Sequence, residues 1–373
     1  MRFPEFSGEW EKYVLTEFVE RVTRRNKGNE CKLPLTISAQ YGLVDQITFF
    51  NKIIASDDMS NYYLLTNGDF AYNKSYSSEY PWGAIKRLDR YEYGALSSLY
   101  ICFRPLNHVS SDFLTHYFET KKWHQGISEI AVEGARNHGL LNIGIQDFFA
   151  TKHYLPQSIL EQEKIACFLN LIEERIRLQN KIIEDLKKLK SAIRKKMFSF
   201  LKDEYTESFE INQLLDYEQP TAYIVANDEY STDTSLTPVL TANKGFILGY
   251  TDEKFGIYQK GECIIFDDFT MDAKYVSFPF KVKSSAIKIL TAKPNVNLRF
   301  MFEYLSYWEL KSEEHKRHYI SEIASLVIEL PSKERQSIIA SLMTSLNSKL
   351  DIEAKTKIRY EEQKRYLLSQ MFI

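Results

Sequence analysis

Cysteine is scarce in this sequence, and long apolar runs are absent. The four cysteines form no CxxC pair and lie far apart, at Cys31, Cys102, Cys167 and Cys263. Zinc knuckles and disulfide frameworks need closely spaced cysteines, so we expect reduced thiols that serve packing. No run approaches the ~18 apolar residues of a membrane-spanning helix, and the first residues lack the apolar core of a signal peptide. These absences favour a cytoplasmic protein without a membrane partner.

The motifs of several enzyme classes are also missing. The chain has no GxxxxGK[ST] or GxGxxG phosphate loop and no Asn-Pro-Pro-aromatic tetrapeptide, so neither nucleotide chemistry nor DNA methylation is expected of it. A metal-dependent nuclease is a rival interpretation, because Asp267, Asp268, Asp272 and Lys274 could hold Mg²⁺ and a water, although such residues are ordinary in a turn after a strand. His315 and His318 lie one helical turn apart without further nearby ligands. We assign no catalytic residue and no metal ligand.

Two stretches contain no glycine and only their first proline, residues 156–202 and 331–373, and each follows a leucine. Their apolar residues alternate steps of three and four, which predicts long helices with a coiled-coil seam. The seam of the first comprises Ile165, Leu169, Ile172, Ile176, Gln179, Ile183, Leu186, Lys190, Ile193 and Met197. Adding 174 to each number gives the seam of the second: Ile339, Met343, Leu346, Leu350, Glu353, Lys357, Tyr360, Lys364, Leu367 and Met371.

This offset indicates an internal repeat of a globular region followed by a long helix. The 373 residues suffice for two or three compact units, and short apolar runs between Gly, Asn, Asp and Tyr predict α+β folds before each helix. We expect globular regions at 1–155 and 203–328 and helices at 156–202 and 329–373, with pseudo-two-fold symmetry. Such a protein suits a target with two similar half-sites, and palindrome-like DNA is one candidate.

Charge is distributed unevenly over these parts. Residues 156–202 hold 11 Lys/Arg against 6 Asp/Glu, and residues 329–373 hold 8 against 6, so the remainder of a chain with net charge -2 carries -9. The stretch 187–202 contains seven basic residues and no acidic one. A basic helix face is usually only solvated, although contact with phosphates or with an acidic protein is also open to it.

Polar and aromatic residues at corresponding places of the two halves are candidates for DNA contact. Arginine reads guanine bidentately and asparagine reads adenine, although the same residues could equally serve the local scaffold. The candidates are Tyr72, Asn73, Lys74, Arg136, Asn137 and His138 in the first half, and Asn243, Lys244, Lys274, Tyr275, Arg317 and His318 in the second.

Three further motifs are informative: residues 2–11 (RFPEFSGEWE), residues 65–74 (LTNGDFAYNK), and residues 154–165, where Tyr-Leu-Pro is followed by Glu-Gln-Glu-Lys-Ile. With these motifs and its duplicated layout, the whole chain resembles the specificity subunit of type I restriction-modification enzymes. The second half departs from the pattern, because residues 331–336 are one residue shorter than their counterpart and residues 207–211 lack a tryptophan.

The resemblance implies two target recognition domains, each reading one half of a bipartite double-stranded DNA site, separated by two antiparallel helices. It further implies that two methyltransferase subunits dock on the helices and that restriction or translocase subunits join the complex. S-adenosylmethionine, ATP and Mg²⁺ would be held by those partners, and this chain would supply no chemistry. Helices of about 40 residues at ~1.5 Å each would measure ~60 Å, longer than one ~34 Å turn of DNA, and could set the half-site spacing. Apolar helix faces left bare by absent partners could cause self-association. A coiled-coil scaffold that never touches DNA is the alternative.

Overall fold

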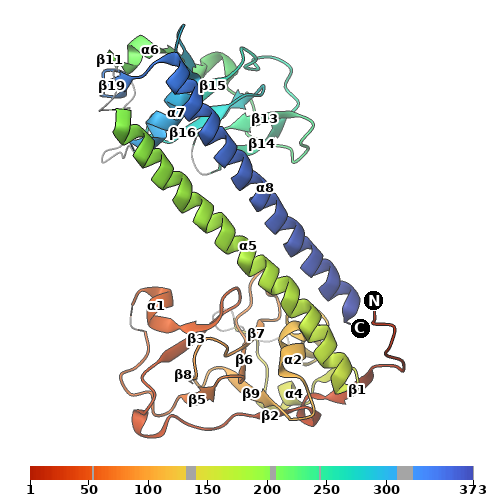
Figure 1. Ribbon diagram of the computed structural model, residues 1–373. Coiled ribbons are helices and arrows are strands. Elements are labelled where there is room, and N and C mark those ends of the chain that lie inside the picture. Colours follow the sequence, from red (N-terminus) through yellow and green to blue (C-terminus); the bar gives the residue numbers. More distant parts are fainter. Residues whose placement is uncertain (53, 132–139, 202–206, 243–244, 309–321, 373) are drawn as a thin grey trace. The chain divides into compact units, whose positions relative to one another are not determined.

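The computed structural model describes residues 1–52, 54–131, 140–201, 207–242, 245–308 and 322–372. The chain divides into two compact units, a first unit of Met1–Gln179 with Thr356–Ile373 and a second unit of Asn180–Lys355. Each unit holds one globular region and a part of both long helices (Figure 1). The boundaries drawn from the sequence stay a prediction. Among the described residues, none of the helices combines the length and the hydropathy of a bilayer span.

The first globular region is built mainly from short strands. Its elements are β1 (Glu11–Val14), η1 (Leu15–Glu17), β2 (Val19–Arg21), η2 (Lys27–Asn29), β3 (Pro34–Ser38), β4 (Gly42–Asp45), α1 (Gln46–Phe50), β5 (Tyr63–Thr66), β6 (Phe70–Asn73), β7 (Ala84–Arg87), β8 (Tyr93–Leu96), β9 (Ile101–Pro105), α2 (Ser111–Tyr117), α3 (His124–Ile130), α4 (Ile145–Phe149) and β10 (Lys152–Leu155). One sheet has the order β2-β9-β6-β7, a second has the order β4-β3-β8-β5 with β3 parallel to β8, and β1 pairs with β10.

The second globular region follows the same plan. Its elements are β11 (Glu207–Glu210), α6 (Ile211–Leu214), β12 (Leu215–Glu218), η4 (Pro220–Tyr223), β13 (Thr237–Leu240), β14 (Ile247–Thr251), β15 (Cys263–Asp267), β16 (Ala273–Val276), β17 (Lys281–Val282), β18 (Ile287–Ala292), α7 (Leu298–Tyr307) and β19 (Val327–Leu330). Its sheets have the orders β12-β18-β15-β16 and β14-β13-β17, with β13 parallel to β17, and β11 pairs with β19.

The two regions share one topology. The order β2-β9-β6-β7 matches β12-β18-β15-β16 strand for strand, and the parallel pair β3 and β8 matches β13 and β17. Gly68 and Gly261 start the corresponding strands β6 and β15 from turns with φ of 89° and 105°, which glycine adopts without steric cost. Side chains of Ser110 and Asn297 cap the corresponding helices α2 and α7. The internal repeat and the α+β class expected from the sequence are confirmed.

The two long helices, α5 (Ile159–Phe200) and α8 (Lys333–Met371), contribute to both cores. In the first unit, the beginning of α5 (Ile165, Leu169) shares a buried cluster with the end of α8 (Leu367, Met371). In the second unit, Phe198 near the end of α5 shares a cluster with Ile339 and other residues at the beginning of α8. The helices therefore pack antiparallel within each unit. Burying these side chains contributes about 1.5–3 kcal/mol each to folding.

Every predicted seam position of both helices is buried or half-buried, and most positions between them are exposed. The seam includes three polar residues near the middle of the helices, Gln179, Glu353 and Lys357. Gln179 is only 6% exposed. The 3.5-residue period read from the sequence is therefore the burial period of the structure.

Candidate nucleic-acid interface

The candidate DNA contacts of the first unit lie at the end of β6. Asn73 and Lys74 are half-buried, and the Asn73 Oδ1 accepts a hydrogen bond from the Ser75 amide at 2.9 Å. Tyr72 is fully buried: its hydroxyl donates to the Trp82 carbonyl at 2.9 Å, and its ring stacks on Phe148 with centroids 4.9 Å apart. Burial raises the pKa of the Tyr72 hydroxyl. Tyr72 is therefore a core residue, and the expectation of a DNA contact by its side chain is corrected.

The described candidates of the second unit, Lys274 and Tyr275, lie on β16 and are half-buried. The Arg299 guanidinium lies 3.8 Å from the centroid of the Tyr275 ring. Burial and the neighbouring Glu262 raise the pKa of Tyr275 to about 12. Tyr275 and Arg299 line an open hollow of the second unit together with Glu262. Lys274 and Tyr275 both stay candidates for DNA contact.

The remaining candidates lie outside the described residues and stay predictions. They are Arg136, Asn137, His138, Asn243, Lys244, Arg317 and His318. His315, considered for a metal site from the sequence, lies in the same undescribed segment as His318.

Asp267 and Asp268, the adjacent carboxylates of the nuclease alternative, make contacts that stabilise the local fold. The Asp267 Oδ1 accepts from the amides of Phe269 and Thr270, both at 2.9 Å, which forms a turn after β15. Asp268 lies 3.4 Å from the Lys288 ammonium, and both side chains are 1% exposed. This arrangement favours the turn over a metal-holding nuclease site.

Two of the motifs behind the family resemblance meet at the start of α5. Arg2 donates two hydrogen bonds to the Glu161 carboxylate, both at 2.6 Å, and Trp10 Nε1 donates to the same carboxylate at 3.3 Å. Glu161 is 1% exposed. A buried carboxylate with this bidentate partner fixes the amino-terminal segment against α5. This contact explains why Arg2, Trp10 and Glu161 occur together although about 150 residues separate the last from the others.

Gln162 and Gln336 make the same pair of hydrogen bonds in the two units. Gln162 Nε2 donates to the Pro156 carbonyl and its Oε1 accepts from the Ser110 amide, each at 2.9 Å. Gln336 donates to the Pro331 carbonyl and accepts from the Asn297 amide at the same distances. The pair persists although the second proline lies one residue closer to its glutamine. The sequence contained the clue, because the glutamines lie 174 residues apart, but it did not reveal the bonds.

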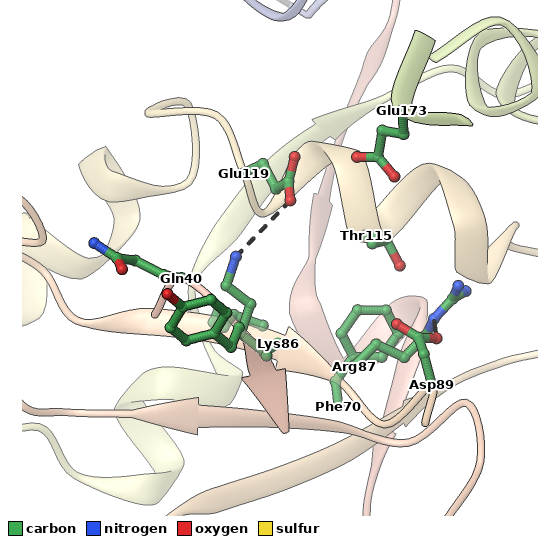
Figure 2. A pocket seen from close by; sticks show the side chains of 11 residues that line it. Gln40, Phe70, Lys86, Arg87, Asp89, Thr115, Glu119 and Glu173 are labelled. Carbon is green, nitrogen blue, oxygen red and sulfur yellow. Dashed lines mark hydrogen bonds and ion pairs between the residues drawn. The ribbon is translucent and has the colours of Figure 1, made fainter. Parts of the chain in front are cut away.

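A charged cluster attaches the end of α8 to the first globular region. Lys364 Nζ lies 2.7 Å from Glu119 Oε2 and 2.6 Å from Glu173 Oε1. Lys86 also approaches Glu119, to 3.8 Å, and Figure 2 shows this pair with Glu173 nearby. Burial acts to raise the pKa of Glu119, but the two ammonium groups outweigh it and hold that pKa below its ordinary value. Burial acts to lower the pKa of Lys364, but the carboxylates outweigh it and raise that pKa. The ion pairs therefore stabilise the charged forms of both groups.

The same cluster contains the one set of side chains with metal-ligand spacing among the described residues. Ligand atoms of His116, Glu119 and Glu173 lie within 4.8 Å of one another. Lys364 already contacts both carboxylates, and His116 Nε2 lies 2.8 Å from Asn170 Oδ1. Because a lysine supplies the positive charge, we interpret the cluster as a packing contact of α8.

The second unit has a polar cluster at the matching place. Glu303 of α7 is fully buried, and its carboxylate accepts from Arg194 Nη2 at 2.7 Å and from Asn347 Nδ2 at 3.1 Å. Asn347 lies 174 residues after Glu173, and Glu303 follows its helix cap by the same six residues as His116. Both units therefore fix the long helices with polar contacts as well as apolar ones. Arg194, read from the sequence as part of a basic face, is engaged in this contact.

The part of α5 in the first unit carries a second apolar face outside the seam. Leu160, Leu171 and Leu178 are 66%, 59% and 45% exposed, and Cys167 between them is exposed as well. Steps of seven, four and seven place these four side chains within a narrow stripe of the helix surface. We call Leu160, Cys167, Leu171 and Leu178 the exposed stripe. Apolar side chains aligned in this way differ from single leucines scattered over a surface and are typical of a contact with another protein.

Comparisons with known proteins agree on one family. Residues 203–362 match the family described as Type I restriction modification DNA specificity domain. The chain is 39% identical over 178 residues to the Escherichia coli type I restriction enzyme EcoR124I/EcoR124II specificity subunit, and the match covers 43% of each protein. The match therefore spans less than half of that curated relative.

Solved structures extend the likeness to the whole chain. The S subunit of a type I restriction-modification system from M. genitalium has a TM-score of 0.64 at 15% identity, over 100% of this chain and 99% of that one. A chain from a structural study of assembly and conformational transition in a type I restriction-modification system has a TM-score of 0.57 at 14% identity, over 98% of both chains. At such identities the likeness establishes the fold.

Proposed function

Because this chain is similar in sequence and fold to specificity subunits of type I restriction-modification systems, we propose that it belongs to their family and selects the DNA sequence for such a complex. Each globular region would read one half of a bipartite site in double-stranded DNA. The chain itself would be non-catalytic and would act in the cytoplasm.

The observation that carries this proposal is the duplicated fold. Two globular regions have matching strand order, and equivalent glutamine hydrogen bonds attach the first region to the start of α5 and the second region to the start of α8. A scaffold needs helices but has no use for two α+β regions built alike. Two similar readers on one chain suit two half-sites on one DNA duplex.

We further propose that two methyltransferase subunits dock on the long helices, with restriction or translocase subunits joining the assembly. The exposed stripe supports this, because keeping an apolar helix face in water is unfavourable and covering it with a partner protein lowers the free energy. S-adenosylmethionine, ATP and Mg²⁺ would belong to those partners. When the partners are absent, the exposed stripe would favour self-association.

The proposal that α5 and α8 set the half-site spacing gives a quantitative prediction. Inserting one heptad after Gln179 and one after Lys355 would lengthen both helices by ~10 Å while keeping the seam in register. We expect the same two half-sites with a gap longer by about three base pairs, at ~3.4 Å per pair. Methylation mapping of the assembled complex measures the gap. An unchanged gap would refute the spacer role. The control replaces one existing heptad of each helix by another heptad with the same seam pattern, which keeps the helix length and should leave the gap unchanged.

DNA retention by the purified chain tests the recognition role against the scaffold alternative. We expect retention of duplex DNA that weakens linearly with the logarithm of salt concentration, because phosphate contacts release counterions. Fluorescence anisotropy with a labelled duplex measures it. A folded chain that retains no DNA at ~50 mM salt would favour the scaffold.

A further inference from the structure

Three exposed arginines, Arg21, Arg24 and Arg25, lie at the end of β2 and directly after it. Their guanidinium groups gather on β5. Arg21 Nη2 donates to the Tyr63 hydroxyl at 3.3 Å, and the Arg25 guanidinium lies 4.4 Å from the centroid of the same ring. Arg24 Nε donates to the Leu64 carbonyl at 3.4 Å. Tyr63 and Leu64, which are neighbours on β5, therefore contact all three guanidinium groups.

These arginines differ from others of the first unit in what they contact. Arg2 pairs with Glu161, Arg87 with Asp89 and Asp112, and Arg104 with Asp69. In the described part of the chain, Arg21, Arg24 and Arg25 form no ion pair, and their polar partners are neutral oxygens, with the Asn61 carbonyl completing the set for Arg25. Their charges are therefore not compensated within the described residues.

Gathered like charges repel one another, and each guanidinium has donors left over, since it carries five N–H groups. The repulsion is relieved when an anion binds. The Tyr63 ring, which is 4% exposed, and the β5 backbone hold the side chains in place beforehand, so little conformational entropy remains to be lost on binding. Phosphate groups match both the charge and the donor geometry of arginine.

We infer that Arg21, Arg24 and Arg25 form a phosphate-binding site of the first globular region, which grips the DNA backbone beside the half-site that this region reads. The inference rests on the proposed DNA-recognition function and adds a site to it. Phosphate contacts fix the position of a protein on DNA without reading sequence. The site should thus serve affinity and leave base preference to other residues.

The test compares a triple variant, Arg21→Gln, Arg24→Gln and Arg25→Gln, with the unmodified full chain by fluorescence anisotropy on a duplex over a range of salt concentrations. Each lost phosphate contact lowers the slope of log K against log salt by ~0.9, so we expect a slope smaller by about 2 to 3. At the lowest salt, binding should weaken about 10- to 100-fold. The ranking of different duplex sequences should not change.

Two matched variants make the test specific. Lysine at the three positions keeps the charges and should restore most of the affinity. Glutamine at the exposed Lys12, Lys121 and Lys122 removes as many charges elsewhere in the same region and should leave the slope nearly unchanged. A triple arginine variant with an unaltered slope, or a lysine control with an equal loss, would overturn the inference. If the unmodified chain fails to bind any duplex, both the inference and the proposed function fail.

Discussion

Replacing Gln162 by leucine is expected to destabilise the first unit by about 2 to 5 kcal/mol, and Gln336→Leu should do the same to the second unit. Each glutamine is buried and satisfies a backbone carbonyl of the Leu-Pro segment together with the amide at a helix cap. Leucine has nearly the same volume but offers neither a donor nor an acceptor. Two buried backbone groups would then lose their partner, at about 1 to 3 kcal/mol each.

Urea unfolding followed by circular dichroism measures both variants. Gln363→Leu on the exposed face of α8 is the matched control and should change the free energy of unfolding by less than about 0.5 kcal/mol. Loss of similar size at both sites would support equivalent roles in the two units. A large loss at Gln162 with none at Gln336 would contradict the functional equivalence of the repeat.

The first unit should lose about 3 kcal/mol of stability as the pH falls from 6.5 to 4, because of His153. This imidazole is buried, with Nδ1 2.9 Å from the Tyr117 hydroxyl and Nε2 2.8 Å from Thr151 Oγ1. Burial lowers the pKa of His153 to about 4. Between that pH and the ordinary value near 6.5, the unfolded chain binds a proton that the folded chain does not. The contribution of the neutral His153 to the free energy of unfolding is therefore fully present above pH 6.5. It declines as the pH falls, until the imidazole of the folded chain is also protonated.

Tryptophan fluorescence can follow this transition in the first unit. The chain has four tryptophans, and a Trp308→Phe background leaves only Trp10, Trp82 and Trp123, all in the first unit. His153→Gln in that background should be less stable at pH 7 but should lose much less stability between pH 6.5 and 4. An equally steep decline in the glutamine variant would show that another group causes the pH dependence.

The sequence was sufficient to predict the long helices, their seam and the repeat. Periodic apolar positions report which face of a helix is buried, and a constant offset of 174 reports duplication, so both can be read without knowing any tertiary contact. The antiparallel packing within each unit agrees with what the family resemblance implies.

Tyr72 shows where such reasoning stops. Alternation along β6 would place its neighbours Ala71 and Asn73 on the other face of the strand, yet Ala71 is buried too, so both faces of the strand are covered at this point. Burial on both faces results from packing against residues far away in the sequence, such as Phe148. The pattern of apolar residues along β6 alone does not reveal such contacts. The bond between Gln162 and Ser110 and the arginine cluster on Tyr63 likewise join residues about 40 to 50 positions apart.

Co-expression of the chain with a methyltransferase partner, followed by single-molecule mapping of N6-methyladenine, tests the central claim most directly. The proposed function predicts one bipartite motif, with two defined half-sites and a gap of fixed length. A stable complex that methylates no defined motif, or a single undivided one, would contradict the claim that two recognition domains read the DNA.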